Sequence, residues 1–210
     1  MLRWRPRIAA LARACELSYV AGGGTSGGTA LLAHLRVSVD HVREHRLTKN
    51  RGLHQRGLAV ARVLTAGGGA AGVAVDVACV HLGLDATERV AHTGEVLALL
   101  QARGAVSGPS PVVLAGDLNE APGGPAWALL AGAGLTDACG TGPGSAQMTF
   151  TARNPRRRID GVFLDGALDV VRAGVPTDLA DPADLVTASD HRPVLAVVRL
   201  PVASPGGSSG

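Results

Sequence analysis

The spacing of apolar residues divides the chain into predicted helices and strands. Apolar positions recur at helical spacing in residues 7–17 and 85–104, and residues 124–134 form a shorter apolar stretch typical of a helix. Other segments run apolar or alternate with a period of two, as strands do. These predicted strands are residues 29–37, 57–64, 72–82, 111–119, 158–165, 168–175 and 192–200.

Glycine-rich and polar segments mark the predicted connections. Residues 21–28 read as a loop, and "TAGGGAAG" (65–72) reads as the turn of a β-hairpin between its two flanking strands. The polar, basic residues 40–56 are expected to form a surface excursion. The helix over 85–104 is expected to stop at Gly104, with Arg103 near the C-terminal end of its dipole.

Hairpins mixed with helical crossovers, and strands that outnumber helices, indicate an α/β (α+β) domain whose sheets are covered by helices. Residues 1–200 are expected to form one domain, followed by a flexible tail over 201–210. The chain is 46% hydrophobic and 18% charged, which excludes disorder as the default state. The 29 glycines and 12 prolines agree with many turns.

The net charge of +3 is nearly all carried by arginine, because Lys49 is the only lysine. Arginine suits phosphate, since its planar guanidinium donates two hydrogen bonds at once, but this excess is too small to require a nucleic-acid partner. Aromatic residues, at 2%, leave few rings on which bases could stack. The three cysteines, Cys15, Cys79 and Cys139, are far apart and predict neither a disulfide framework nor a zinc site.

No stretch has the length and apolar character of a membrane span, and the N-terminus lacks the clean apolar core of a signal peptide. We therefore expect a cytoplasmic protein, unless a segment upstream carries an export signal.

The stretch "VVLAGDLNEAP" (112–122) is the first that suggests chemistry. Residues i and i+2 of a strand face the same way, so Asp117 and Asn119 are expected to point together at a strand end, where α/β folds place ligands. A carboxylate beside an amide oxygen could hold Mg²⁺ or orient a water against phosphate. The alternative for this pair alone is a capped turn, because Asp and Asn are ordinary turn residues.

Further polar residues fall at the edges of other predicted strands. Asp190 offers a second oxygen ligand, and His191 could bind a phosphoryl oxygen or act as an acid or base. In an extended segment these two neighbours would face opposite ways. His81 ends an apolar run, where a structural hydrogen bond is the alternative role.

Asp160 enters a strand and could orient a histidine by accepting its ring proton. The alternative is an ion pair with Arg157 or Arg158, and Arg158 is also a candidate phosphate ligand. Together, two His, three Asp and one Asn at strand edges are the inventory of a metal-assisted phosphoester hydrolase.

The motifs "VHLGLD…ER", "GDLNEAP", "RRRIDGVFLD" and "SDHRPVLAVV", in this order, resemble the endonuclease/exonuclease/phosphatase superfamily. The resemblance covers about residues 1–200. It implies a four-layer sandwich of two packed mixed β-sheets flanked by helices, and phosphoester cleavage that depends on Mg²⁺ or Mn²⁺. It also implies roles for Asp117 and Asn119 (water and scissile phosphate), His81 (phosphate or leaving oxygen), Asp160 (orienting His191), Asp190 (metal) and His191 (charge on the phosphoryl oxygens).

The family's N-terminal strand–helix–strand unit, with its metal-binding glutamate, has no counterpart here, so we expect the chain to start just after it. Two readings follow: a metal-dependent phosphodiesterase, nuclease or phosphatase, and a catalytically impaired remnant that binds phosphorylated ligands without turnover. A third reading is a plain scaffold. The expected partner is a phosphoester substrate, with nucleic acid as one candidate through the basic segment "HVREHRLTKNRGLHQR", and the expected state is a monomer.

Overall fold

The computed structural model describes residues 5–65, 73–141 and 147–201. Its helices are α1 (Arg5–Ala14), α2 (Ala86–Ser107), α3 (Pro125–Gly132), α4 (Ala138–Thr141) and α5 (Pro182–Thr187), with a 3-10 turn at Gly24–Ser26. Its strands are β1 (Ser18–Gly22), β2 (Ala30–Ala33), β3 (Ser38–Arg46), β4 (Gly57–Thr65), β5 (Val73–His81), β6 (Val112–Asp117), β7 (Leu135–Asp137), β8 (Asp160–Asp165), β9 (Asp169–Gly174) and β10 (Leu195–Arg199).

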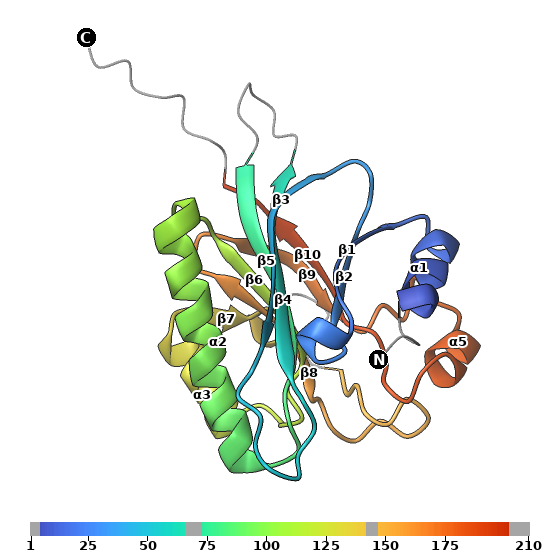
Figure 1. Ribbon diagram of the computed structural model, residues 1–210. Coiled ribbons are helices and arrows are strands. Elements are labelled where there is room, and N and C mark those ends of the chain that lie inside the picture. The colour runs from blue at the N-terminus through green and yellow to red at the C-terminus, as the bar shows by residue number, and fades with distance from the viewer. Residues whose placement is uncertain (1–4, 66–72, 142–146, 202–210) are drawn as a thin grey trace.

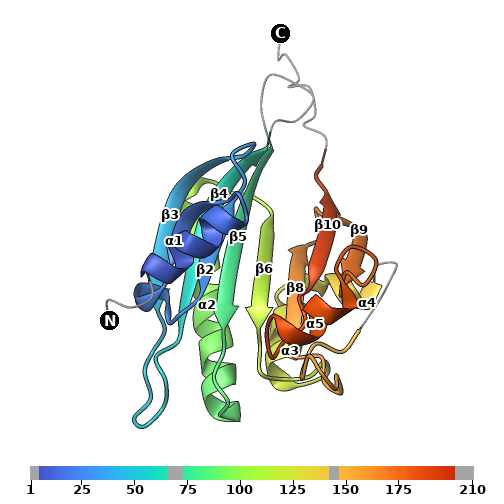
Figure 2. The same ribbon diagram turned by 90° about the vertical axis from the view of Figure 1, so that its right-hand side faces the viewer.

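The elements are stacked in layers around a six-stranded sheet with the strand order β3-β4-β5-β6-β8-β7. Helices α2 and α3 cover one face of this sheet, and the pairs β1–β2 and β9–β10 lie over the other (Figure 1). Helices α1 and α5 lie outside those pairs, as the turned view also shows (Figure 2). We call the sheet face toward the two strand pairs the inner face.

The six-stranded sheet is mixed because one connection is a helical crossover. Strands β5 and β6 are parallel, joined through α2, whereas the other neighbouring strands are antiparallel. The β4–β5 ladder runs from Leu58↔Val80 to Thr65↔Val73, so the predicted hairpin strands are confirmed. A parallel pair has its carboxyl ends at one edge of the sheet, which brings His81 beside Asp117.

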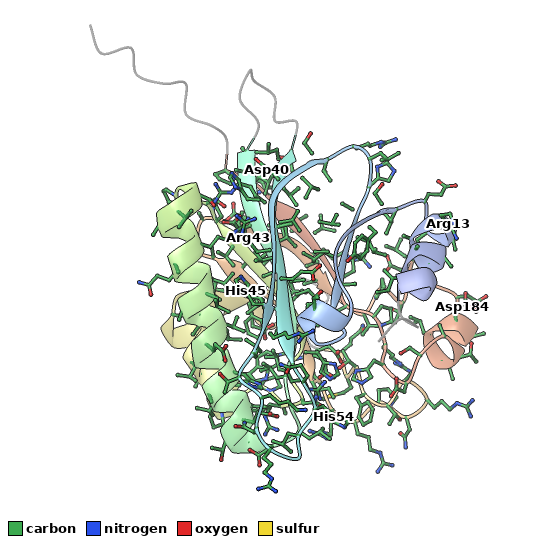
Figure 3. All side chains as sticks on the ribbon, in the orientation of Figure 1. Arg13, Asp40, Arg43, His45, His54 and Asp184 are labelled. Carbon is green, nitrogen blue, oxygen red and sulfur yellow. The ribbon has the colours of Figure 1, made fainter. Side chains whose placement is uncertain are left out.

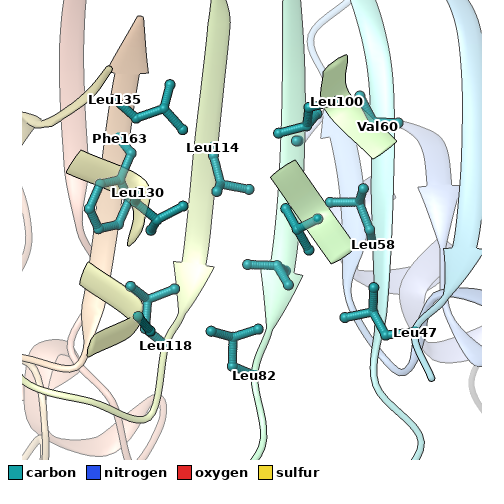
Figure 4. Close-up of a cluster of buried hydrophobic side chains, with 14 of the residues drawn as sticks. Leu47, Leu58, Val60, Leu82, Leu100, Leu114, Leu118, Leu130, Leu135 and Phe163 are labelled. Atoms are coloured by element: carbon teal, nitrogen blue, oxygen red, sulfur yellow. The ribbon is translucent and has the colours of Figure 1, made fainter. Parts of the chain in front are cut away.

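The main core lies between the sheet and α2 and α3 (Figure 4). Alternate strand residues such as Leu58, Leu114 and Phe163 point into it and are almost fully buried. Trp127 of α3 packs edge-on against Phe163, with ring centroids 4.8 Å apart. A second cluster on the inner face joins the sheet to β9 and β10 through residues that include Val75, Val162 and Ala173.

The fold class is confirmed, but the second sheet differs from the prediction. Two separate antiparallel pairs, β1–β2 and β9–β10, stand where a continuous mixed sheet was expected, and no ladder joins them in the described part of the chain. Strand β1 itself was not predicted. Its residues Ser18–Gly22 are short and half polar, so they carry little periodic signal.

The prediction of a surface excursion over residues 40–56 is wrong for its first half. Strand β3 occupies Ser38–Arg46 and pairs along β4 as the edge of the main sheet. It is polar because most of its side chains stay at least partly exposed, and its ladder is interrupted by a bulge between Asp40 and Arg43, where His41 has a φ of 46°. Edge strands commonly combine charge and bulges in this way.

The prediction that the long helix stops at Gly104 is also wrong, because α2 continues to Ser107. Its last carbonyls have a partner that lies far away in sequence: Arg62 of β4 donates hydrogen bonds to the carbonyl oxygens of Ser107 and Gly108. At the other end Asp85 caps the helix by accepting from the Glu88 backbone N–H at 2.9 Å.

The remaining predictions match elements to within a few residues, except that β7, α4 and α5 had no counterpart. The turn of the hairpin (66–72) and most of the C-terminal tail (202–210) lie outside the described residues. None of the described helices is long and apolar enough to cross a membrane.

Candidate functional site

Three strand ends place acidic and imidazole side chains together on the inner face. On β5, β6 and β8 the residues that alternate with the main-core residues face inward, and this set ends in His81, Asp117 and Asp160. The ladders pair His81 with Asp117 and Asp117 with Asp160, so the three lie side by side across adjacent strands. The strand order therefore assembles residues that are up to 79 positions apart in sequence.

The "GDLN" stretch is a tight turn at the end of β6. Gly116 has a φ of 155°, and a Cβ added there would lie 1.9 Å from the carbonyl oxygen of Val80, so only glycine fits. Asn119 adopts the left-handed conformation, with a φ of 52°. Its backbone N–H donates to Asp117 Oδ1 at 2.8 Å. Asp117 and Asn119 thus come together through a turn, and not through strand alternation as predicted.

Asp160 and His191 form the closest pair of the site. His191 Nδ1 lies 2.9 Å from Asp160 Oδ2 and 3.2 Å from Asp160 Oδ1. In the structure Asp160 thus pairs with His191, and Arg158 pairs with Asp137 instead. The ring of His191 also packs against Phe150, with centroids 4.9 Å apart, and its Nε2 lies 3.9 Å from Asp117 Oδ2. Asp160 therefore fixes the ring so that Nε2 points toward Asp117.

His81 and Asn119 form the other side of the cluster. The Asn119 Nδ2 donates to the carbonyl oxygen of Leu82 at 2.8 Å, which sets the orientation of the amide, and it lies 3.2 Å from His81 Nε2. Because Nδ2 can only donate, His81 Nε2 accepts and its ring is the neutral Nδ1–H tautomer. His81 Nε2 is also 3.4 Å from Asp117 Oδ2.

The environment separates the pKa values of the two histidines. Burial lowers the pKa of His81 to about 4, and the charges of Arg56 and His191 act in the same direction. Burial alone would lower the pKa of His191, but its hydrogen bond to Asp160 and the charges of Asp160, Asp117 and Asp190 raise it above the ordinary value. A neutral and a more basic imidazole thus stand on either side of Asp117.

The surroundings of Asp117 disfavour the charged form of its side chain. Burial raises its pKa, and the charge of Asp160 adds to this, while the Asn119 N–H, His191 and Arg56 oppose it. Its side chain is 15% exposed, so it remains accessible from the cavity. A cation near Asp117 and Asp160 would relieve the repulsion between the two carboxylates.

Asp117, Asp160 and His191 form a group whose ligand atoms all lie within 4.8 Å of one another. This set differs from the sequence prediction, which assigned the metal to Asp190. The Asp190 carboxylate is exposed and accepts a hydrogen bond from the Ser189 hydroxyl, so of the two neighbours only His191 joins the cluster. Two carboxylates and one imidazole suit a divalent cation that keeps several waters, such as Mg²⁺ or Mn²⁺.

The cluster opens into a cavity of about 530 Å³ on the inner face. Asp117, Asp160 and His191 line it beside Ala115, Val162 and Val194, and residues of α5 close its far side. Small and apolar side chains therefore form most of the wall, with a few polar groups among them, which is the usual form of a binding site.

Arg158 lies apart from the cluster and is fully engaged. Its guanidinium donates to both carboxylate oxygens of Asp137, at 3.0 and 2.6 Å, and its centre lies 4.7 Å from the Trp127 ring. The residue is buried. These contacts join β7 to α3, and they leave Arg158 without the freedom that a phosphate ligand needs.

Arg56 is a residue of the site that the sequence analysis missed. It immediately precedes β4, and its charge lowers the pKa values of both His81 and Asp117. Its Nε is buried with no hydrogen-bond partner among the described residues. The predicted hairpin was the available signal, because an antiparallel pair brings the start of β4 to the end of β5, as the pairing Leu58↔Val80 shows.

Comparisons with known proteins bear on the family and the fold of this chain. The family model described as the endonuclease/exonuclease/phosphatase family matches residues 2–191. A sequence comparison with curated proteins gave no significant match.

Solved structures share the fold at low sequence identity. The mannosyl-6-phosphatase Bt3783 of Bacteroides thetaiotaomicron is 18% identical, with a TM-score of 0.79 over 93% of this chain and 82% of that one. The human Nocturnin catalytic domain with bound sulfate is 17% identical, with a TM-score of 0.67 over 95% and 76%. The D. rerio TDP2 complexed with a single-strand DNA product is 18% identical, with a TM-score of 0.66 over 93% and 82%. The strand-end cluster, the layered fold and the family match over most of the chain lead to one conclusion: this chain belongs to the endonuclease/exonuclease/phosphatase family.

Proposed function

We propose that this protein is a metal-dependent phosphoester hydrolase whose active site is the cluster of His81, Asp117, Asn119, Asp160 and His191. One observation carries the proposal: a carboxylate, Asp117, lines a cavity and stands between a neutral imidazole and a more basic one. Such an arrangement can position a water, a phosphoryl group and a proton donor together.

Each side chain has a role that follows from its contacts. Asp160 holds His191 through Nδ1, so that the protonated ring directs Nε2 at a phosphoryl oxygen and stabilises its developing charge. Asp117 accepts a hydrogen bond from the attacking water and orients it. The amide of Asn119 is fixed by Leu82, and together with His81 it contacts the phosphate or the leaving oxygen.

One arginine and one metal ion would supply the positive charge of the site. Arg56, whose Nε has no partner among the described residues, lies on the side of His81 and supplies positive charge toward a bound phosphate. Asp117 and Asp160 would hold the divalent cation through their carboxylate oxygens, while His191 stays a hydrogen-bond donor beside it. When bound, the cation supplies charge neutralisation and Lewis acidity at the phosphoryl oxygens.

The similar structures support a phosphoester substrate in general. One of them is a mannosyl-6-phosphatase, one was solved with a bound sulfate anion and one was solved as a complex with a single-strand DNA product. A sulfate is a phosphate-like oxyanion, and the other two names point to a phosphomonoester and to nucleic acid. We propose the shared chemistry, cleavage of a phosphoester bond, for this chain.

A second candidate is phosphate binding without turnover. It is favoured by the ligand set, because one of the two carboxylates, Asp160, is already paired with His191 and only Asp117 is left to neutralise a metal. A weakly held cation would leave a site that binds phosphorylated ligands but cleaves them slowly.

The test is hydrolysis of bis(p-nitrophenyl) phosphate and p-nitrophenyl phosphate with Mg²⁺, Mn²⁺ or EDTA, by wild type and by Asp117→Asn. Asp169→Asn is the matched control, because Asp169 is an exposed carboxylate of β9 outside the site. Metal-dependent turnover that is lost only in Asp117→Asn supports the hydrolase. If the folded wild type binds inorganic phosphate but releases no nitrophenol under any of these conditions, the binding role replaces it.

A further inference from the structure

A second group of basic side chains lies on the other face of the six-stranded sheet, between β3 and the C-terminal half of α2. Arg43 and His45 are two positions apart on β3 and therefore share a face, which is the face toward α2 (Figure 3). With His41 they line a cavity of about 200 Å³, whose opposite wall includes Arg103 and Ser107 of α2. We call this cavity the β3–α2 groove.

Arg103 brings a buried positive charge to this groove. Its side chain is only 7% exposed, and its Nε lies 3.0 Å from Asp76 Oδ1. Asp76, however, is already bonded through both carboxylate oxygens to Arg62, at 3.1 and 2.9 Å. Neither Nε nor Nη2 of Arg103 has a hydrogen-bond partner within the described ranges. One buried carboxylate thus serves two guanidinium groups, which leaves an excess positive charge at the base of the groove.

The other charges near the groove do not cancel this excess. Burial and the charges of Arg103 and Arg43 lower the pKa of His45, and these effects outweigh the opposite effect of Glu95. Asp40 is exposed and pairs with His41 at 3.4 Å. A positive field at His45 is the expected surrounding of an anion site.

The end of α2 does not repel an anion as a free helix C-terminus would. The carbonyl oxygens of Ser107 and Gly108 both accept hydrogen bonds from Arg62, so the negative end of the helix dipole is covered by a cation. Ser107 is itself one of the residues that line the groove. The cations thus stand beside Leu99, Ala102 and Val106 of α2, and no carboxylate among the described residues lines the groove.

We propose that the β3–α2 groove is a binding site for a small phosphate-type dianion, separate from the catalytic cluster. The cavity is smaller than the roughly 300 Å³ at which pockets for larger organic ligands begin, so it suits a phosphate group and not a base or a nucleic-acid strand. Arg43 and His45 donate hydrogen bonds to the phosphate oxygens, and the positive charge of Arg103 attracts the dianion. The site lies on the α2 face and does not depend on the proposed function.

The test follows the imidazole NMR signals of the full 210-residue chain during titration with inorganic phosphate near neutral pH, with ionic strength held constant by NaCl. Saturable shifts of the His45 signals, and a rise of its pKa with phosphate, are expected. Arg43→Gln should weaken this binding about tenfold, the loss of one charge-assisted hydrogen bond. Because Arg43 is exposed, the variant is expected to fold. Arg36→Gln, an exposed arginine outside the groove, should bind phosphate as wild type does.

Two further arms separate this site from the catalytic cluster and identify the ligand. His191→Gln should keep the His45 response, since His191 lies on the inner face. Phenyl phosphate is compared with inorganic phosphate. Tighter binding of either supports the proposal, and it shows whether the groove prefers a phosphate monoester or the free phosphate ion. The proposal is overturned if His45 does not respond, if Arg43→Gln binds phosphate like wild type, if the response disappears with His191, or if a short oligothymidylate binds there more tightly than both.

Discussion

His191 and Asp160 are joined at 2.9 Å between Nδ1 and Oδ2, although they lie 31 residues apart in sequence. Because this bond sets both the ring orientation and the raised pKa of His191, Asp160→Asn should lower kcat about 10- to 100-fold while leaving KM within a few-fold. Steady-state kinetics with p-nitrophenyl phosphate esters measure both constants. Asp169→Asn should behave as wild type, and an equal kcat for Asp160→Asn would remove Asp160 from the mechanism.

Asn119 allows the backbone and the amide to be tested separately. Asn119→Gly keeps the left-handed conformation and removes the amide, so kcat should fall about 100-fold with a nearly unchanged Tm. Asn119→Ala also removes the amide but keeps a Cβ, without the local hydrogen bonds that let Asn adopt a φ of 52°, so it should cost about 1–2 kcal/mol of unfolding free energy as well. Kinetics and thermal melts of the two variants check this. Equal activity of wild type and Asn119→Gly would show that the amide takes no part.

Gly116 should tolerate no side chain. Gly116→Ala would push a methyl group to within 1.9 Å of the Val80 carbonyl oxygen, where the two strands that carry His81 and Asp117 meet. We expect a loss of more than about 2 kcal/mol of unfolding free energy, measured by urea denaturation. Gly134→Ala is the matched control, because Gly134 also has a positive φ, of 84°, but nothing lies within 4 Å of its added Cβ. A smaller loss in Gly116→Ala than in Gly134→Ala would contradict the prediction.

Asp76 should be one of the most sensitive charged positions. Asp76→Asn leaves the buried guanidinium groups of Arg62 and Arg103 without a counter-charge, so it should cost about 3–5 kcal/mol of unfolding free energy. Denaturation of both proteins near neutral pH measures this difference.

The advantage of the wild type over Asp76→Asn should also depend on pH. Burial alone would raise the pKa of Asp76, but the hydrogen bonds from Arg62 and the charge of Arg103, whose Nε lies 3.0 Å away, outweigh it and the pKa is lowered. The stabilisation is therefore fully present above the unfolded-state pKa of about 3.9 and is lost as the pH falls below it through the folded-state value. A stability difference that stays constant down to the acid transition would contradict this assignment.

Sequence patterns predicted the core strands because burial imposes periodicity on them. The runs that became β4, β5, β6 and β8 are apolar along nearly their whole length. Strand β3 and the last turn of α2 were missed for the opposite reason: each is held by a partner distant in sequence. β3 is polar and is defined by its ladder with β4, and the end of α2 is held by Arg62.

The residues of the candidate site also fall into a group that the sequence could single out and a group that it could not place. The motif order was sufficient to single out His81, Asp117, Asn119, Asp160 and His191, and the structure brings these side chains into contact. The positions of Asp190 and Arg158 depended on contacts that the motifs do not encode. Arg158 follows two other arginines in the chain, and nothing in that run indicates that Asp137 takes its guanidinium.

The two edges of the six-stranded sheet have a consequence for the behaviour of the molecule in concentrated solution. One edge is β7, with only three residues, and the other is β3, with a bulge and a row of charged side chains. A strand from a neighbouring molecule would find too little backbone at the first edge and a broken register at the second. Both edges of the sheet therefore disfavour pairing with another molecule. Substitution of Arg43 or Glu44 by apolar residues would make such pairing, and hence aggregation, easier at β3.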